Sequence, residues 1–372
     1  MSHRLAWRTG LADTVFARLT RRITQGHITR LAPVPERTAS EPVRHVYRGL
    51  AREFGVLAPP VTLHAVSPPV LAACWLMLRE ALLAHSHVGR DTKEAVAAAV
   101  SLANRCPYCV DVHGSALRGL LRGPDARAIA DDRLAEVADA RLRRMAEWFR
   151  HGAGASSAVP PRVPPAQLPE LIGVAVLFHY LNRVVNVFLV PSPLPTGLPP
   201  VAAPVARRAA AVILGRFARR RGAPGADLAL LPPAPLPPDL AWAAGNDAVA
   251  TAFARAGAAI DGAAEHRVPA AVRRLLTDLL AGPSGLRAVT DRAGLEAALR
   301  AVAQRDQPAA RLVLTTAFFS WRVTDAMVSD CHLEDRALLE LVAWAALTTA
   351  RAAGRRLAAD WAAGDPSGRG GW

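Results

Sequence analysis

The chain has 372 residues, of which 51% are hydrophobic and 20% are charged. A chain of this length and composition buries a large core, which excludes disorder throughout and favours two domains or a duplicated one. The formal net charge is +14 at pH 7, yet Lys93 is the single lysine and the arginines are spread along the whole chain. The charge is therefore weak evidence for binding to nucleic acid or to an acidic membrane.

Helices dominate the predicted secondary structure. Aromatic residues make up 5% of the chain, and its apolar stretches are built from Ala and Leu rather than from alternating β-branched residues, which disfavours strands. The helical pattern predicts helices, in chain order, at 69–85, 91–104, 107–121, 132–151, 169–188, 205–221, 247–264, 270–280, 295–304, 309–328 and 335–359. The predicted fold class is all-α.

Three proline-rich segments divide the chain, at 159–169, 191–204 and 222–238. Proline prevents a helix from continuing and favours stiff, extended connectors. The division predicts a helical domain at 1–190, a proline-rich connector with a short Arg-rich helix at 191–238, and a second helical domain at 239–372.

The two halves share a short sequence likeness. The segment from Glu170 (Glu-Leu-Ile-Gly-Val-Ala) resembles the segment from Glu340 (Glu-Leu-Val-Ala-Trp-Ala), and the helix at 309–328 then corresponds to 91–121. In that alignment Phe-Ser-Trp-Arg takes the place of Cys-Pro-Tyr-Cys, so the second half is a degenerate copy without the cysteines. Two Leu/Ala-rich helices also look alike by composition alone, and both explanations stay open.

The N-terminal sequence and the most apolar stretch bear on the compartment. In residues 1–19, Arg and Asp interrupt every apolar run before a signal-peptide core forms. The apolar stretch at 171–190 contains His179, Asn182 and Arg183, which are costly in lipid, and it is interpreted as a buried helix. We therefore expect a cytoplasmic protein with reduced thiols and no membrane partner.

The four cysteines are too few for a disulfide scaffold, but two of them form a Cys-x-x-Cys pair, Cys106 and Cys109. Pro107 suits the first position of a helix and not its interior, which predicts that one helix ends near Asn104 and a new one begins at Cys106. Cys106 then lies at the N-cap and Cys109 in the first turn, close enough to form a disulfide. Free N–H groups and the helix dipole there are expected to lower a cysteine pKa.

Two further residues fall in register with this pair. His113 lies one helical turn beyond Cys109 on the same face. If the second helix folds back antiparallel, Glu94 lies about 16 Å below the turn and His113 about 13 Å below it, nearly level on facing helices. The sequence thus predicts a relay in which Glu94 orients His113 and His113 takes a proton from Cys109, with added hydrogen bonds from Tyr108 and Ser101.

The segment from Lys93-Glu94 to His113 resembles the active-site pattern of the alkylhydroperoxidase D-like proteins of the carboxymuconolactone decarboxylase superfamily. That pattern is Glu, eleven residues, Cys-x-x-Cys, three residues, His. The helix at 170–183 is similar to the family's closing helix, and the resemblance covers about residues 50–190. It implies an alkylhydroperoxidase D-like helical bundle and a thiol-dependent peroxidase that reduces organic hydroperoxides or hydrogen peroxide.

The resemblance also implies residue roles. Cys109 matches the cysteine that attacks the peroxide, Cys106 the partner that closes the disulfide and donates a proton, and Glu94 and His113 the proton relay. Tyr108 departs from the family, whose characterised peroxidases have histidine there, which puts the strength of the relay and the preferred substrate in question. The decarboxylase branch lacks the paired cysteines, so their presence argues against lactone chemistry.

The resemblance further implies reduction by a dithiol, such as a lipoyl group or a thioredoxin-like donor, with no bound cofactor. A thiol reductant protein or a partner peroxiredoxin is expected as partner. A homo-oligomer is expected, although an internal duplication would satisfy the same interface within one chain.

Several alternatives remain open from the sequence. The cysteine pair with His113 and either His85 or His87 suits zinc, and a redox sensor or scaffold would oxidise without turnover.

Other polar or reactive residues have simpler interpretations: His179 as a core histidine, Asn182 and Arg183 as braces between helices, Cys74 as a buried small hydrophobe, Cys331 in a loop, and Arg219-Arg220-Arg221 as a solvated helix end rather than a DNA contact.

Overall fold

The computed structural model describes residues 24–151, 160–194 and 202–364. Within these ranges every regular element is a helix, and extended pairing is limited to two isolated bridges, Ile28 with Leu189 and Ala84 with Gly222. The predicted all-α class is therefore confirmed for the described residues. The expectation about a signal peptide at 1–19, and parts of the proline-rich segments at 159–169 and 191–204, fall outside them.

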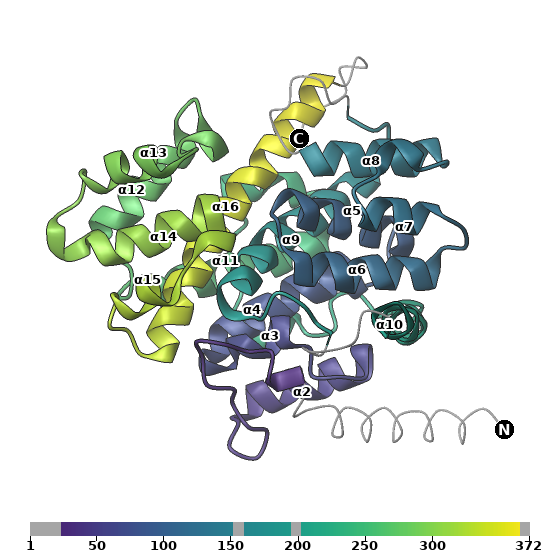
Figure 1. Ribbon diagram of the computed structural model, residues 1–372, viewed down its shortest axis with the longest axis horizontal. Helices are drawn as coiled ribbons and strands as arrows, with labels where there is room; N and C mark the ends of the chain where they lie inside the picture. The colour runs from purple at the N-terminus through teal and green to yellow at the C-terminus, as the bar shows by residue number, and fades with distance from the viewer. Residues whose placement is uncertain (1–23, 152–159, 195–201, 365–372) are drawn as a thin grey trace.

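The first half of the chain, which contains the Cys-x-x-Cys pair, runs from purple to teal in Figure 1. Its elements are α2 (Glu41–Phe54), α3 (Pro59–Thr62), η1 (Leu63–Val66), α4 (Pro68–Leu78), the π-helical turn η2 (Arg79–Leu83), α5 (Arg90–Ala103), α6 (Pro107–Leu120), α7 (Asp125–Ala130), η3 (Leu134–Glu136), α8 (Ala140–His151), η4 (Pro165–Gln167) and α9 (Leu168–Phe188).

The remaining helices begin with α10, which lies beside α6 in Figure 1, and end with the long α16, which crosses the molecule. They are α10 (Ala203–Ala218), η5 (Leu228–Leu230), η6 (Pro238–Ala243), α11 (Asp247–Ala264), α12 (Ala270–Ala281), η7 (Gly285–Arg287), α13 (Arg292–Leu299), η8 (Gln304–Asp306), α14 (Gln307–Phe319), η9 (Ser320–Arg322), α15 (Asp325–Ser329) and α16 (Asp335–Gly364).

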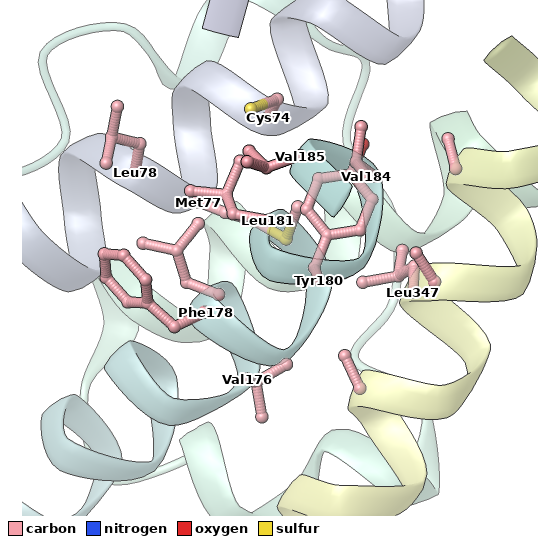
Figure 2. Close-up of a cluster of buried hydrophobic side chains, with 14 of the residues drawn as sticks. Cys74, Met77, Leu78, Val176, Phe178, Tyr180, Leu181, Val184, Val185 and Leu347 are labelled. Carbon is pink, nitrogen blue, oxygen red and sulfur yellow. The ribbon is translucent and has the colours of Figure 1, made fainter. Parts of the chain in front are cut away.

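The α9 helix is the centre of the core. It is apolar on nearly all sides, the pattern of a helix surrounded by protein, and every residue of it except Asn186 is buried. Although it is long and apolar enough to cross a membrane, its side chains contact α4 and α16 in a common cluster that includes Met77, Leu181 and Leu347 (Figure 2). The interpretation of 171–190 as a buried helix is confirmed.

Helices from the two halves pack directly on each other. The α16 helix lies along α9, and α11 lies along α4, so that one continuous hydrophobic cluster spans both halves. In Figure 1, α12 to α15 lie on one side of α16 and α5 to α8 on the other. The division into two helical units at 1–190 and 239–372 stays a prediction.

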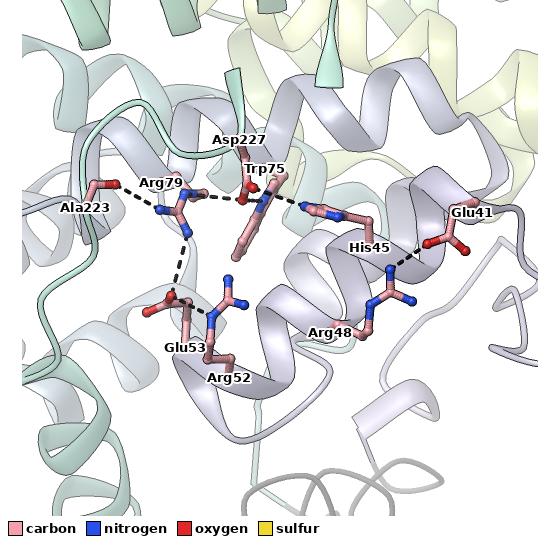
Figure 3. A network of polar contacts seen from close by, with 9 residues as sticks. All are labelled: Glu41, His45, Arg48, Arg52, Glu53, Trp75, Arg79, Ala223 and Asp227. Carbon is pink, nitrogen blue, oxygen red and sulfur yellow. Dashed lines mark hydrogen bonds and ion pairs between the residues drawn. The ribbon is translucent and has the colours of Figure 1, made fainter. Parts of the chain in front are cut away.

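The segment that follows α10 is held by a polar network on α2, α4 and η2 (Figure 3). Asp227 accepts hydrogen bonds from Trp75 Nε1 at 2.8 Å and from His45 Nε2 at 3.0 Å, and its carboxylate lies 3.4 Å from Arg79 Nε. Arg79 also donates to the Ala223 carbonyl at 3.0 Å. This part of the predicted connector is therefore packed against the first half.

Two predicted helices are interrupted. The predicted 132–151 helix is wrong because α8 begins only at Ala140, where the Asp139 carboxylate accepts from two backbone N–H groups of the first turn. The predicted 309–328 helix is wrong because α14 ends at Phe319 and α15 begins after Thr324, whose side chain accepts from Met327 N. Side-chain hydrogen bonds of this kind favour the start of a new helix over the continuation of the preceding one. The spacing of hydrophobic residues does not predict them.

The predicted helix at 295–304 is shifted toward the N-terminus. The Asp291 side chain accepts from Gly294 N at 2.7 Å and so starts α13 at Arg292, and the helix ends at Leu299. The predicted helix at 205–221 is likewise shifted, since α10 runs from Ala203 to Ala218. The predicted helix at 335–359 ends too early, because α16 continues to Gly364. The other predicted helices begin and end within about two residues of the observed ones, which is the usual uncertainty of helix boundaries.

The close approach of α6 and α10 depends on two glycines. A Cβ atom on Gly119 would lie 2.2 Å from the Ala211 carbonyl oxygen and 2.5 Å from the Gly215 Cα. We expect Gly119→Ala to separate the helices and lower the free energy of unfolding by about 1–3 kcal/mol. Gly262→Ala is the matched control, because nothing lies within 4 Å of a Cβ there, and it should raise stability by about 0.5–1 kcal/mol. Urea unfolding of both variants measures the difference, and equal effects would contradict close packing at Gly119.

Candidate active site

A tight reversal between α5 and α6 positions the candidate residues. The Arg105 backbone has φ = 50°, a left-handed conformation that costs a non-glycine residue about 1–2 kcal/mol and turns the chain back. Cys106 is the N-cap of α6 and Pro107 is its first residue, as predicted. The Cys106 N–H donates to the Ser101 carbonyl at 2.9 Å, which closes the turn and lays α6 against α5.

The two cysteines of the pair are in contact as free thiols. Their sulfur atoms are 2.9 Å apart, and the exposed fractions of Cys106 and Cys109 are 0% and 3%. Burial raises the pKa of Cys106 well above its ordinary value, and the neighbouring Cys109 raises it further. The expectation that the helix N-terminus lowers a cysteine pKa is therefore wrong for Cys106, because burial outweighs the dipole. Cys106 is held as a protonated thiol.

The predicted contact between Glu94 and His113 is present. His113 Nδ1 lies 2.6 Å from Glu94 Oε2, and the imidazole and the Phe178 ring meet edge to face with ring centroids 4.4 Å apart. Arg90, one turn before Glu94, donates through Nε to Glu94 Oε1 at 2.8 Å. The antiparallel α5–α6 pair therefore brings the carboxylate and the imidazole together from 19 positions apart.

The charge of Glu94 is maintained inside the protein. Its exposed fraction is 1%, and burial alone raises the pKa of a carboxyl group. Arg90 and His113 outweigh that effect through their charges and hydrogen bonds, so the pKa of Glu94 is lowered overall. A carboxylate paired in this way stabilises a protonated His113.

Polar side chains of α9 form a cluster next to the turn between α5 and α6. From the sequence, Asn182 and Arg183 of this cluster were expected only to brace neighbouring helices. Asn182 Nδ2 donates to Ser101 Oγ at 3.0 Å, its Oδ1 accepts from Asn104 Nδ2 at 3.0 Å, and its side chain also contacts Cys106. Ser101 donates to the Ala97 carbonyl at 2.7 Å, so its hydroxyl supports Asn182 rather than contacting the relay. No residue spacing links Asn182 to Cys106, since the two lie on different helices far apart in the chain.

Two further α9 residues complete this cluster. His179 Nδ1 lies 3.1 Å from the Asn104 amide, and burial followed by the charge of Arg183 lowers its pKa to about 3. His179 is thus a neutral, hydrogen-bonded core histidine, and none of its hydrogen bonds in the described part of the chain is to a thiol. Arg183 Nε donates to the Ala317 carbonyl at the end of α14, which confirms its interpretation as a brace between helices.

Tyr108, between the cysteines, contacts His27, which the sequence did not indicate as a site residue. Its hydroxyl lies 3.2 Å from His27 Nδ1, and the two rings meet edge to face. The expected hydrogen bond from Tyr108 to the relay is absent among the described contacts.

The remaining candidates lie elsewhere. Cys74 is buried, which raises its pKa strongly, as expected of a thiol that acts as a small hydrophobe. Cys331 lies in the turn before α16, where burial and Asp330 raise its pKa to about 11. Arg219 and Arg220 donate to backbone carbonyls of Gly119 and Arg52, so they bind the protein itself.

The described residues do not supply a ligand set for the zinc alternative. Within the described ranges, His, Cys, Asp and Glu side chains form no group of three or more that suits a metal ion.

Comparison with known proteins agrees with this geometry. The sequence profile of the carboxymuconolactone decarboxylase family matches residues 69–150, which include both cysteines, Glu94 and His113. An alkyl hydroperoxide reductase of Mycobacterium tuberculosis is 36% identical over 335 residues, which make up 88% of this chain and 94% of that protein. The chain therefore belongs to the carboxymuconolactone decarboxylase family, as an alkylhydroperoxidase D-like member.

Proposed function

We propose that this protein is a thiol-dependent peroxidase that reduces alkyl hydroperoxides through the Cys106–Cys109 pair. The observation that carries the proposal is the 2.6 Å contact of Glu94 with His113, one helical turn from a cysteine whose sulfur touches a second thiol. The similarity to a protein named as an alkyl hydroperoxide reductase supports the same reaction.

The first step forms the nucleophile. His113, oriented through Nδ1 by Glu94, accepts the Cys109 proton directly or through one water. The Cys109 thiolate attacks one peroxide oxygen, so that an S–O bond forms while the O–O bond breaks. Cys109 becomes a sulfenic acid, and the alkoxide leaves as the alcohol after taking up one proton.

The second step uses the protonated partner. The Cys106 sulfur attacks the Cys109 sulfenic acid, forming the disulfide and releasing water that carries the Cys106 proton. The 2.9 Å separation of the two sulfurs means that little movement is needed. A dithiol then reduces the disulfide by exchange, and a lipoyl group or a thioredoxin-like protein has the required chemistry.

We infer that the second half is a degenerate copy that supports the first. The N-cap residue of α4, Ser67, donates to Glu340 of α16 at 2.8 Å, and the N-cap residue of α11, Asn246, contacts Glu170 of α9 at 3.4 Å. In each contact, the first glutamate of one of the two similar segments binds the N-cap residue of a helix in the other half. The element η9, which takes the place of the cysteine pair in that alignment, contains no thiol.

Stoichiometric oxidation followed by turnover tests the peroxidase. One equivalent of cumene hydroperoxide should convert both thiols of the reduced protein to an intramolecular disulfide, observed by mass spectrometry of the tryptic peptide. Repeated turnover should then follow with dihydrolipoamide or with thioredoxin as the reductant. Thiols that remain free after exposure would overturn the proposal, and oxidation without turnover with either reductant would favour a redox sensor.

A further inference from the structure

His27 is positioned by the backbone rather than by its own side chain. The Val190 N–H donates to the His27 carbonyl at 3.0 Å, and the Thr29 N–H donates to the Phe188 carbonyl at 2.7 Å. These bonds attach residues 27–29 to the end of α9. The imidazole is thereby held over Tyr108, with Nδ1 3.2 Å from the phenol oxygen.

Tyr108 lies between the two cysteines in the first turn of α6, and its hydroxyl keeps its proton. Burial raises the pKa of Tyr108, and the negative charges that Cys109 and Cys106 acquire on ionisation raise it further. Burial lowers the pKa of His27, which keeps the imidazole neutral, with one nitrogen able to donate and the other to accept. His27 is partly exposed, whereas Tyr108 is buried.

The peroxide reaction needs an acid at this position. Breaking the O–O bond of an alkyl hydroperoxide releases an alkoxide, which is strongly basic and is poorly stabilised in a site closed to water. Glu94 and His113 form the base that removes the Cys109 proton. A neutral hydroxyl near the thiols with its own connection to solvent has the complementary properties of a general acid.

We propose that Tyr108 protonates the alkoxide leaving group and that His27 restores the Tyr108 proton from solvent. This proposal rests on the proposed peroxidase function. As the Cys109–O bond forms and the O–O bond breaks, the Tyr108 O–H proton passes to the alkoxide oxygen. His27 Nδ1–H returns a proton to the phenol oxygen, and water at the partly exposed imidazole replaces it. The proton that His113 removed from Cys109 leaves to solvent, so the charge balances.

The oxidant itself tests this assignment. A peroxycarboxylic acid such as peracetic acid releases a carboxylate, which is a weak base and needs no proton donor. Tyr108→Phe should therefore lower the second-order rate of Cys109 oxidation by cumene hydroperoxide about 100-fold, and the rate with peracetic acid less than about 3-fold. A defect in folding or in thiolate formation would slow both reactions equally, and equal losses would overturn the proposal.

His27 is tested through the same ratio. His27→Ala should slow the reaction with cumene hydroperoxide about 10-fold and leave the peracetic acid rate within about 3-fold of wild type. If the alanine variant does not fold, His27→Asn, which retains a hydrogen-bonding group near the Nδ1 position, replaces it and should show the same selective loss. Wild-type rates with both oxidants would remove His27 from the reaction.

A second His–Tyr pair provides the matched control. His64 Nδ1 donates to the Val61 carbonyl, so the Tyr180 hydroxyl donates to His64 Nε2, at 2.8 Å, and both residues are buried. Tyr180→Phe removes the same hydroxyl and should leave the ratio of the two oxidation rates unchanged. Failure of the peroxidase function would appear in the wild type as no Cys109 oxidation by either oxidant, whereas failure of this proposal leaves wild-type oxidation intact.

Discussion

Replacing Cys109 by serine should lower hydroperoxide reduction at least about 1,000-fold, because it removes the atom that attacks the peroxide. Cys106 is not expected to replace it, since burial raises the pKa of Cys106 and leaves it as a poorly nucleophilic thiol. The measurement is steady-state consumption of cumene hydroperoxide with dihydrolipoamide as the reductant.

Cys106→Ser is the informative partner of this variant. It retains the Cys109 thiol and the Glu94–His113 contact, so one equivalent of peroxide should still be consumed rapidly. Without a resolving thiol, the reaction should stop at the sulfenic acid, which a dimedone adduct on Cys109 reveals. If the two variants exchanged these behaviours, the nucleophile and the resolving cysteine would have to be reassigned.

The second large effect is expected at Glu94. Glu94→Gln retains the size of the side chain but removes the charge that stabilises a protonated His113, and it leaves Arg90 without its carboxylate. We expect kcat/KM for the hydroperoxide to fall about 100-fold at neutral pH. The rate of Cys109 alkylation by iodoacetamide should fall with it, since both reactions need the thiolate.

Glu340→Gln is a close control for that substitution. Glu340 and Glu94 are each 1% exposed, and each is paired with an arginine one helical turn earlier at 2.8 Å, Arg336 for Glu340 and Arg90 for Glu94. Both glutamine variants should lower the melting temperature, but only Glu94→Gln should slow the chemistry of the folded protein. Comparable loss of kcat/KM at Glu340 would mean that the effect at Glu94 reflects folding alone.

The proline at position 107 allowed much of the site to be predicted. It placed the boundary between α5 and α6 correctly, and with it Cys106 at the N-cap. Helical geometry is regular, so the register of Glu94 and His113 on two antiparallel helices followed from counting residues. The caps formed by Asp139, Asp291 and Thr324 were missed, because each depends on a local side-chain hydrogen bond that competes with the periodic pattern.

The α9 residues show which contacts cannot be predicted from residue spacing along the chain. The sequence predicted a buried helix at 171–190 and a bracing role for Arg183, and both are confirmed. It did not indicate that Asn182 supports the turn through Ser101 and contacts Cys106, because the order of packed helices decides which faces meet. Ser101 was expected near the relay and instead supports this contact.

The sequence by itself determined the helical class, the hairpin that carries the cysteines, and the pairing of Glu94 with His113. These depend on interactions over a few residues or on the fixed rise of a helix. Only the tertiary structure decided the state of Cys106 and the surroundings of Tyr108. Burial sets the pKa of Cys106, and His27 reaches Tyr108 from 81 positions away, through backbone bonds at the end of α9. Desolvation and long-range contacts depend on how all the helices pack together, so a local sequence pattern does not predict them.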